Sequence, residues 1–168
     1  EIPLRLVGSE MCIRDRMILV LLMFIGACAG STGGGFKISR LLILCKAIPK
    51  QLSLVIHPRE VKVIRMDGKP IDHNTLRSTN VYLAIYFFIL LVSTLLISVD
   101  NFNLTTNFTA VASTLNNIGP GLDGVGPTRN FGMYSDFSKF VLMFDMLAGR
   151  LELYPLLILF MPSLWRRK

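Results

Sequence analysis

The chain has 168 residues, of which 52% are hydrophobic and 17% charged, and its mean hydropathy is +0.54. This composition is too apolar and too lightly charged for an ordinary soluble domain, and it excludes most soluble enzymes of this size. Because the apolar residues form long runs, we expect an integral membrane protein. In a soluble protein the net charge of +7 would suggest a nucleic-acid partner. In a membrane protein it first raises the question of which loops face the cytoplasm.

Residues 1–16 carry six charges and give way abruptly to an almost uncharged run at Met17. No small-residue cleavage pattern lies at the distance that a signal peptide requires. The segment resembles a translated sequencing adapter, so we expect it to be non-native and leave it out of the functional interpretation. The three cysteines, Cys12, Cys28 and Cys45, are widely spaced and indicate neither a disulfide framework nor a zinc site.

Residues 17–56 are predicted to form a broken transmembrane helix. Two apolar stretches, 17–29 and 38–48, flank a glycine-rich segment. Neither stretch spans alone, because helical residues rise about 1.5 Å each and the hydrocarbon core is about 30 Å thick. Non-helical backbone at membrane depth is tolerated only beside protein or a water-filled cavity, so the pattern predicts a cavity. A short re-entrant or interfacial hairpin is the alternative.

Residues 57–78 are predicted to form a cytoplasmic connector. Nine basic and three acidic residues lie between positions 37 and 77, which indicates the cytoplasmic side. His57-Pro58 is expected to end the preceding helix, and Asp67-Gly68 favours a hairpin or β-turn. His57 and His73 have no second ligand nearby in the sequence, so we expect both to be solvated.

Residues 79–168 contain two predicted spanning helices, 81–99 and 137–161, with a short segment between them. A helix from Asn103 or Thr105 to Leu115 is too short to cross a bilayer and too rich in Thr and Ser to face lipid. We expect it to enter the membrane from outside as a half-helix. The glycines and prolines of residues 116–127 exclude regular structure and predict an ordered loop or a linker.

This order of elements is the unit from which cation filters are built. The half-helix turns the negative end of its dipole toward the pore, and the main-chain carbonyls of Asn116, Asn117, Ile118 and Gly119 can replace the hydration shell of an ion. Glycine at position 119 allows positive φ, which turns a carbonyl inward. One such unit supplies only part of a ring of about four. A structural loop between transmembrane helices is the alternative.

The last predicted helix carries ionisable residues at membrane depth, which are functional candidates by default. Asp145, Ala148 and Glu152 share a face, whereas Arg150 is rotated by about 160° from Glu152. Arg150 therefore needs acceptors outside its own helix, and the freed carbonyls of residues 30–35 are the expected supply. A cation beside a permeation path would repel potassium. A structural arginine that snorkels to one interface is the alternative.

Nucleotide-binding and hydrolytic sites are not indicated. Residues 30–35 fit the frame G-x-x-x-x-G, but the lysine that follows is one position late and the Ser or Thr for magnesium is missing. The sequence has no G-x-S-x-G elbow, so we predict that the chain is not an enzyme.

Four motifs, taken in order, resemble a known family. They are GACAGSTGGGFK at 26–37, HPRE at 57–60, NNIGPG at 116–121 and AGRLE at 148–152. Together they closely resemble the C-terminal third of bacterial TrkH-type potassium uptake proteins, which are related to KtrB and plant HKT transporters. The resemblance covers Met17 to Lys168.

The resemblance implies an all-α integral membrane fold: a fourth M1–P–M2 pore-loop repeat, preceded by the broken M2 helix of the third repeat. It implies an intramembrane gate loop over 26–37, formed by Gly30, Ser31, Thr32, Gly33, Gly34 and Gly35 and contacted by Arg150. It also implies that Asn117, Ile118 and Gly119 bind potassium through their carbonyls, with Gly119 as the filter glycine.

The resemblance further implies a multi-pass protein in the bacterial inner membrane, surrounded by lipid, with a homodimeric assembly and a cytoplasmic TrkA-like nucleotide-binding regulator. Because earlier repeats are missing, we expect this chain to be a truncated portion that is inactive alone. The alternative function is a non-transporting membrane scaffold or interface fragment.

Overall fold

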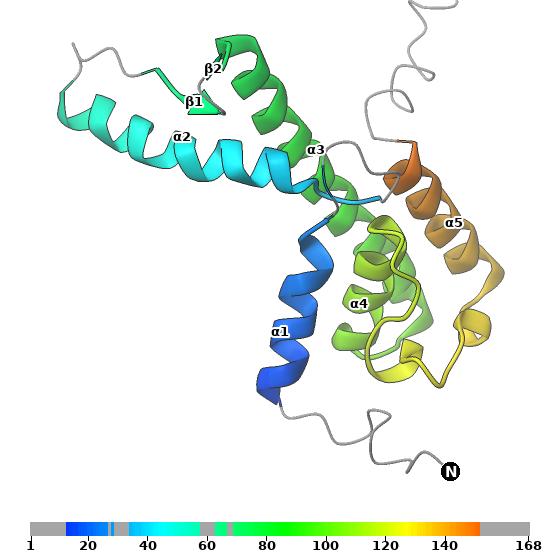
Figure 1. The fold of residues 1–168 in the computed structure, drawn as a ribbon. Helices are drawn as coiled ribbons and strands as arrows, with labels where there is room; N and C mark the ends of the chain where they lie inside the picture. Colours follow the sequence, from blue (N-terminus) through cyan, green and yellow to red (C-terminus); the bar gives the residue numbers. More distant parts are fainter. Residues whose placement is uncertain (1–12, 27, 29–33, 58–62, 67–68, 152–168) are drawn as a thin grey trace, which may run out of the picture.

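The computed structural model describes residues 13–26, 28, 34–57, 63–66 and 69–151, and it is predominantly helical (Figure 1). The helices are α1 (Ile13–Phe24), α2 (Ile38–Ile56), α3 (His73–Ile97), α4 (Leu104–Leu115) and α5 (Asp136–Arg150). Strands β1 (Arg65–Met66) and β2 (Lys69–Pro70) pair antiparallel, and 3-10 turns form at η2 (Ser98–Asp100), η3 (Asp123–Val125) and η4 (Phe131–Met133). The expected helical fold is therefore confirmed.

Helix α4 is the central element of the fold and contacts α1, α3 and α5 (Figure 1). Every residue from 109 to 115 is buried, although the helix is rich in Thr and Ser. Its hydroxyls bond to carbonyls one turn back, as in the 2.7 Å bond from Thr109 Oγ1 to the Thr105 oxygen and the 2.9 Å bond from Thr114 Oγ1 to the Ala110 oxygen. Burial of α4 therefore leaves these hydroxyls satisfied.

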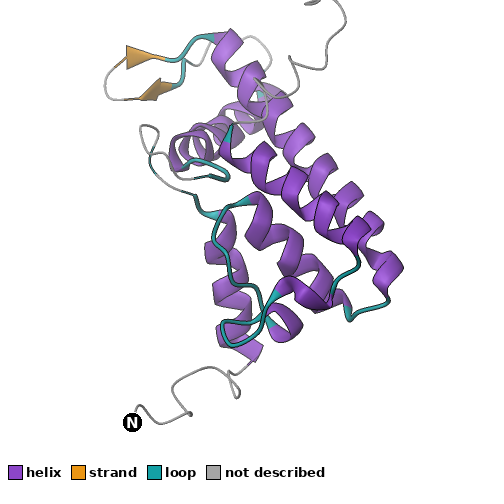
Figure 2. Cartoon of the chain, turned by 90° about the vertical axis from the view of Figure 1, so that its right-hand side faces the viewer, coloured by secondary structure: helices purple, strands orange, loops and turns teal. Residues whose placement is uncertain are grey.

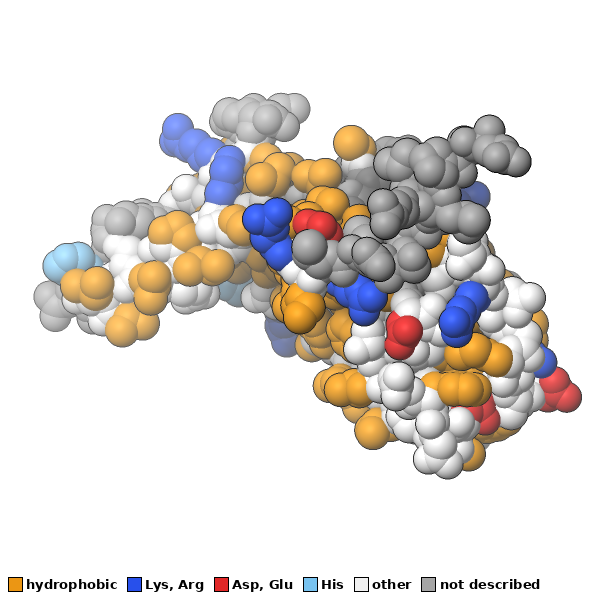
Figure 3. All heavy atoms as spheres, turned by 90° about the horizontal axis from the view of Figure 1, so that it is seen from below, with side chains coloured by type: hydrophobic (Ala, Val, Ile, Leu, Met, Phe, Trp, Pro, Cys, Tyr) orange, Lys and Arg blue, Asp and Glu red, His pale blue; other side chains and the backbone are white. Residues whose placement is uncertain are grey.

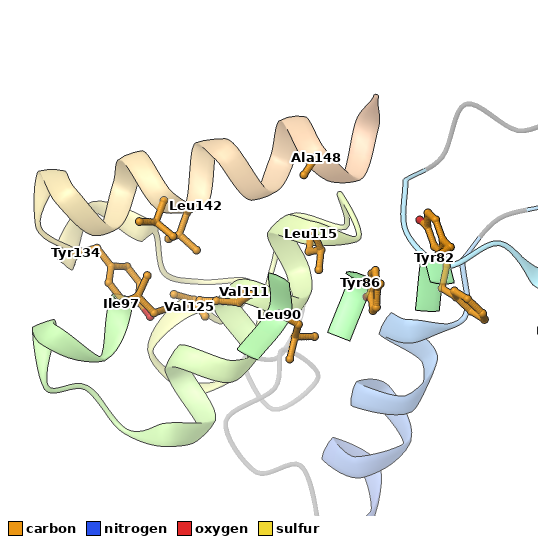
Figure 4. Close-up of a cluster of buried hydrophobic side chains, with 13 residues drawn as sticks. Tyr82, Tyr86, Leu90, Ile97, Val111, Leu115, Val125, Tyr134, Leu142 and Ala148 are labelled. Atoms are coloured by element: carbon orange, nitrogen blue, oxygen red, sulfur yellow. The ribbon is translucent and has the colours of Figure 1, made fainter. Parts of the chain in front are cut away.

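The main hydrophobic core surrounds α4 on the side of α3 and α5 (Figure 4). Its largest fully buried side chains include Tyr86, Tyr134, Ile97, Leu115 and Val111. Figure 4 places Tyr134 at the left end of this cluster and Tyr86 toward the right, next to Tyr82. The half-helix is thus held along its whole length by the two longer helices.

Helix α3 is longer than the apolar run that predicts it. We expected residues 81–99, and the structure begins the helix at His73, two turns earlier, where the sequence is polar. Together with η2 it forms the 28-residue segment His73–Asp100, the one helix in the described part of the chain that is long and apolar enough to cross a bilayer. A hydropathy pattern cannot detect polar helical turns beyond the apolar run.

The N-terminal helices flank an interruption of the chain. Helix α1 ends at Phe24 and α2 begins at Ile38, with residues 27 and 29–33 outside the described part. Helix α1 begins at Ile13, inside the segment that we expected to be non-native. Helix α2 continues through Pro49 to Ile56 and ends before His57 as expected.

Helix α2 forms an arm with many exposed hydrophobic side chains (Figure 3). Its base packs on α3 and on the β-hairpin through Ile43, Ala47, Ile64 and Leu76, which form a second small core. The hairpin expected at Asp67-Gly68 is confirmed, with Arg65 opposite Pro70, although residues 67–68 lie outside the described part (Figure 2). His57 and His73 are both exposed.

Candidate functional site

The chain leaves α4 through a tightly bonded corner at residues 116–118. Asn117 adopts a left-handed conformation with φ of 54°. The amide of Ile118 bonds to the Ser113 oxygen at 2.9 Å, and the amide of Asn117 bonds to the Thr114 oxygen at 3.0 Å. This pattern is a Schellman cap, in which asparagine takes the place of the more usual glycine. The helix end is thus closed, and the sharp turn falls within the predicted filter residues.

This corner contains three of the four predicted filter residues, and Gly119 follows it. In the described part of the chain, no donor binds the main-chain oxygens of residues 116–119. Gly119 has φ of 105°, and a methyl group built there would meet no atom within 4 Å. The conformation, rather than crowding, is therefore what requires glycine. Ile118 is 43% exposed beside it.

The two described glycines of the predicted gate lie directly against this corner. A methyl group on Gly34 would lie 2.8 Å from the Asn117 side-chain nitrogen and 3.2 Å from the Asn116 oxygen. Gly35 has φ of 82°, and a methyl group there would overlap the side-chain oxygen of Asn116. The structure therefore brings part of the predicted gate and part of the predicted filter into contact. Gly30, Ser31, Thr32 and Gly33 lie outside the described residues.

The two ends of the segment between α1 and α2 are hydrogen-bonded to each other. The Gly26 amide donates to the Phe36 oxygen at 2.9 Å, so residues ten apart meet. The ring of Phe24 lies 6.4 Å from the ring of Tyr86 on α3, and the ring of Phe36 lies 6.3 Å from it. The residues at both ends of this segment thus pack on the Tyr86 side chain.

Helix α5 reaches the same corner through a close backbone approach. Gly149 packs on the carbonyl group of Leu115, where a side chain would not fit, and the side-chain nitrogen of Asn117 donates to the Met146 oxygen at 3.1 Å. A methyl group on Gly34 would lie 3.1 Å from the Gly149 oxygen. Three segments distant in sequence therefore meet at Asn117.

Arg150 is exposed at the end of α5, whereas Asp145 and Ala148 are fully buried. This difference fits helical spacing, which places Arg150 on another face. Among the described residues, Arg150 forms no hydrogen bond or ion pair, and α5 contacts the predicted gate through Gly149 instead. A contact between Arg150 and residues 30–33, and the position of Glu152, lie outside the described part.

A buried polar pair joins α3 to α5 behind the corner. Ser93 Oγ donates to Asp145 Oδ1 at 2.7 Å, and the other carboxyl oxygen of Asp145 has no hydrogen-bond partner in the part of the chain that the structure describes. Because the two residues are 52 positions apart, sequence alone did not pair them.

We expect Ser93→Ala to destabilise the protein by about 1–3 kcal/mol, because it leaves the second oxygen of a buried carboxyl group without a donor. The thermal unfolding midpoint of the purified protein in detergent would measure this loss. Ser98→Ala is the matched control, since in the described structure the Ser98 hydroxyl bonds to the Thr94 oxygen one turn back in the chain. Equal midpoints for the two variants would contradict the role of the Ser93 bond.

The loop beyond Gly119 is fastened to α4 by two threonines. The Leu122 amide donates to Thr109 Oγ1 at 3.1 Å, and the Gly124 amide donates to Thr106 Oγ1 at 3.3 Å. Between this loop and α1 lies a cavity of about 520 Å³, whose lining includes Leu19, Met23, Ile118 and Pro120. The predicted filter residue Ile118 thus borders open space rather than packed core.

Two Tyr–Asn pairs were not predicted from the sequence. Tyr86 donates to Asn116 Oδ1 at 2.9 Å at the C-terminal end of α4, and Tyr134 donates to Asn107 Oδ1 at 3.0 Å near its N-terminal end. Burial raises the pKa of Tyr134 to about 12, so its hydroxyl keeps the proton that it donates. A buried tyrosine needs a hydrogen-bond partner, but its sequence position does not indicate which one.

Comparisons with known proteins identify relatives of this chain. Residues 14–167 match the family model TrkH, described as a cation transport protein. The Trk system potassium uptake protein TrkH of Vibrio parahaemolyticus is 39% identical over 150 residues, which are 89% of this chain and 30% of that protein. TrkH of Escherichia coli is 37% identical over 150 residues, covering 89% and 31%.

A solved structure gives the same result. The crystal structure of the potassium transporter TrkH from Vibrio parahaemolyticus superposes with a TM-score of 0.79 at 38% identity, over 90% of this chain and 32% of that one. The chain thus spans about a third of the length of these relatives. These matches define the class as helical membrane transport proteins. Within that class, the chain belongs to the TrkH family of cation transport proteins.

Proposed function

We propose that this chain is the part of a TrkH-type potassium uptake system that supplies one corner of the ion filter and the gate beneath it. The observation that carries the proposal is the contact of Gly34 and Gly35 with Asn116 and Asn117. A stretch that interrupts a helix is placed directly against a corner whose carbonyls are free to face an ion.

In this proposal, potassium is the transported ion and binds to the carbonyls of Asn117, Ile118 and Gly119. The end of α4 adds the negative end of a helix dipole, which favours a cation. The repeat assignment follows: α3, α4 and α5 are the M1, P and M2 elements of the fourth repeat, and α1 with α2 is the broken M2 helix of the third. Residues 26–37 form the gate loop, and Arg150 acts on it.

The remaining features of the proposed system concern its surroundings. It is a multi-pass protein of the bacterial inner membrane, works as a homodimer and binds a cytoplasmic TrkA-like nucleotide-binding subunit. This chain supplies one of the about four repeats that together form a filter, so we expect no transport by it alone. The basic residues of the α2 arm and the connector support a cytoplasmic location for that side.

A chimera tests the proposal directly. This chain's residues 14–167 would replace the matching segment of Vibrio parahaemolyticus TrkH, and the product would be expressed in bacteria that lack their own potassium uptake systems. We expect growth at low potassium, with purified chimera in vesicles taking up rubidium as a tracer. A folded chimera that neither rescues growth nor takes up rubidium would contradict the proposal and favour a non-transporting scaffold.

Substitution of Gly119 in this chimera should weaken selectivity. Gly119→Ser forces a side chain into a conformation with φ of 105°, so the corner must rearrange and move its carbonyl. We expect the preference for potassium over sodium to fall by on the order of tenfold, measured by competition between sodium and rubidium uptake. Gly126→Ser, in the same loop at φ of −63°, is the control. Unchanged competition between sodium and rubidium in the Gly119 variant would show that Gly119 is not part of the filter.

A further inference from the structure

Asp145 is the one fully buried acidic residue among those that the structure describes, and the proposed transport path does not use it. Its side chain has 0% exposure, and its neighbours on the same face of α5 are apolar. Val141 lies one turn before it and Ala148 one turn after it, and both are buried in the main core. The carboxyl group of Asp145 is therefore enclosed by the packed helices of this chain.

The facing helix offers this carboxyl group a single hydrogen bond. Ser93 Oγ on α3 donates to Asp145 Oδ1 at 2.7 Å, whereas Asp145 Oδ2 has no partner among the described residues. Leu90 and Ile97, which lie about one turn to either side of Ser93, belong to the same apolar core (Figure 4). The surroundings of Asp145 thus supply one donor and otherwise hydrocarbon.

In the described part of the chain, no charged group on the helices around Asp145 pairs with it. Helix α4 carries no acidic or basic residue, and the remaining candidates are His73 and Arg77 on α3, Asp100 in η2, and Asp136, Lys139 and Arg150 on α5. Those on α3 lie more than four turns before Ser93. Asp100 accepts hydrogen bonds from Ser135, and Lys139 pairs with Asp136. Arg150 is exposed on another face of α5.

The tyrosines of the same core are also engaged elsewhere. Tyr86 donates to the side chain of Asn116, and Tyr134 donates to the side chain of Asn107. Neither hydroxyl is therefore bonded to Asp145.

We propose that Asp145 is a proton-binding site, which holds its proton as a neutral carboxylic acid between α3 and α5. In this state Oδ1 accepts the hydrogen bond from Ser93, and Oδ2 carries the proton. A carboxylate with one hydrogen bond in an apolar interior costs far more free energy than a neutral acid with one unpaired O–H. The proposal does not rest on transport, so a chimera that fails to take up rubidium would leave it intact.

The bound proton should make folding depend on pH. An exposed aspartic acid has a pKa of about 3.9, so the unfolded chain releases this proton above about pH 5. The folded protein then holds one proton more than the unfolded chain, and raising the pH favours unfolding. Asp145→Asn has a neutral side chain of the same shape at every pH. Relative to this variant, the folding equilibrium constant of the unsubstituted protein should fall by up to about tenfold per pH unit.

Denaturant titrations of the purified protein in detergent, between about pH 5 and pH 7, measure this ratio. Asp136→Asn is the matched control, because it removes an exposed carboxyl group at the start of the same helix, and its ratio to the unsubstituted protein should not change in this way. A ratio for Asp145→Asn that stays constant over the same range would overturn the proposal.

Infrared spectroscopy detects the proton without unfolding the protein. At about pH 6, where exposed carboxyl groups are ionised, the unsubstituted protein should show the carbonyl stretch of a neutral carboxylic acid, which Asp145→Asn abolishes. Ser93→Ala should move this band to higher frequency, because the acid carbonyl loses its hydrogen bond. This shift keeps the test available if Asp145→Asn does not fold. Absence of the band from the unsubstituted protein, or a band unmoved by Ser93→Ala, would contradict the proposed site.

Discussion

Gly149→Ala is expected to lower the thermal unfolding midpoint of the chimera strongly, although alanine is the better helix former. In an open helix the exchange would gain up to about 1 kcal/mol. Here the methyl group would overlap the carbonyl group of Leu115, which is backbone and cannot rotate away. Overpacking of this kind costs about 1–3 kcal/mol or more, so the clash outweighs the gain. Close helix approach through small residues is typical of membrane proteins.

Gly126→Ala serves as the control for this substitution. The nearest atom to its methyl group would be the Asp123 oxygen at 3.3 Å, so a small adjustment suffices. Its backbone conformation suits alanine, and we expect an unchanged or slightly higher midpoint. A midpoint for Gly149→Ala at or above that of the unsubstituted chimera would show that α5 does not pack on α4 as described.

Arg150→Ala is expected to raise rubidium uptake by the chimera by roughly tenfold. In the proposed function Arg150 acts on the gate loop, and it directly follows Gly149, which packs on the corner. Two unit charges about 12 Å apart at an effective dielectric constant of about 20 repel each other by about 1.4 kcal/mol, which corresponds to this factor. Removal of the charge lowers that barrier.

Two further variants separate charge from shape. Arg150→Lys keeps the charge but not the planar fork, so unchanged uptake would assign the barrier to charge and raised uptake would assign it to hydrogen bonding. Lys139→Ala removes a cation from the opposite end of the same helix, where it pairs with Asp136 at 3.4 Å, and should leave uptake unchanged. Uptake by Arg150→Ala no higher than by this control would exclude Arg150 from the gate.

The sequence predicted the helical elements well where one local property decides them. Length and apolarity indicated α3, and the glycines indicated an interruption after α1. The short Thr-rich segment predicted a helix from Asn103 or Thr105 to Leu115, and α4 runs from Leu104 to Leu115 with Asn103 as its N-cap. The start of α3 was less accurate, because its first turns are polar and are stabilised by tertiary packing through Leu76.

The candidate site was predicted as two separate segments, and their contact was not. The sequence gives no distance between Gly35 and Asn116, since they meet only after α3, α4 and α5 have packed. Asn117 in the left-handed conformation had a detectable signal, because asparagine is favoured after a helix end. No signal in the sequence indicated the partners of Tyr86 and Asp145, which are Asn116 and Ser93 and lie 30 and 52 residues away.

The cap at the end of α4 has a consequence for how such a protein matures. Among the described residues, the hydrogen bonds that shape the corner come from α3, α4 and α5: the amides of Asn117 and Ile118 close the helix, and Tyr86 and the Met146 oxygen hold the two asparagines. The corner can therefore reach its final shape as soon as these three helices have been inserted by the translocation machinery. In the proposed function, the filter would then assemble by docking of repeats that have already folded, rather than in one concerted folding step.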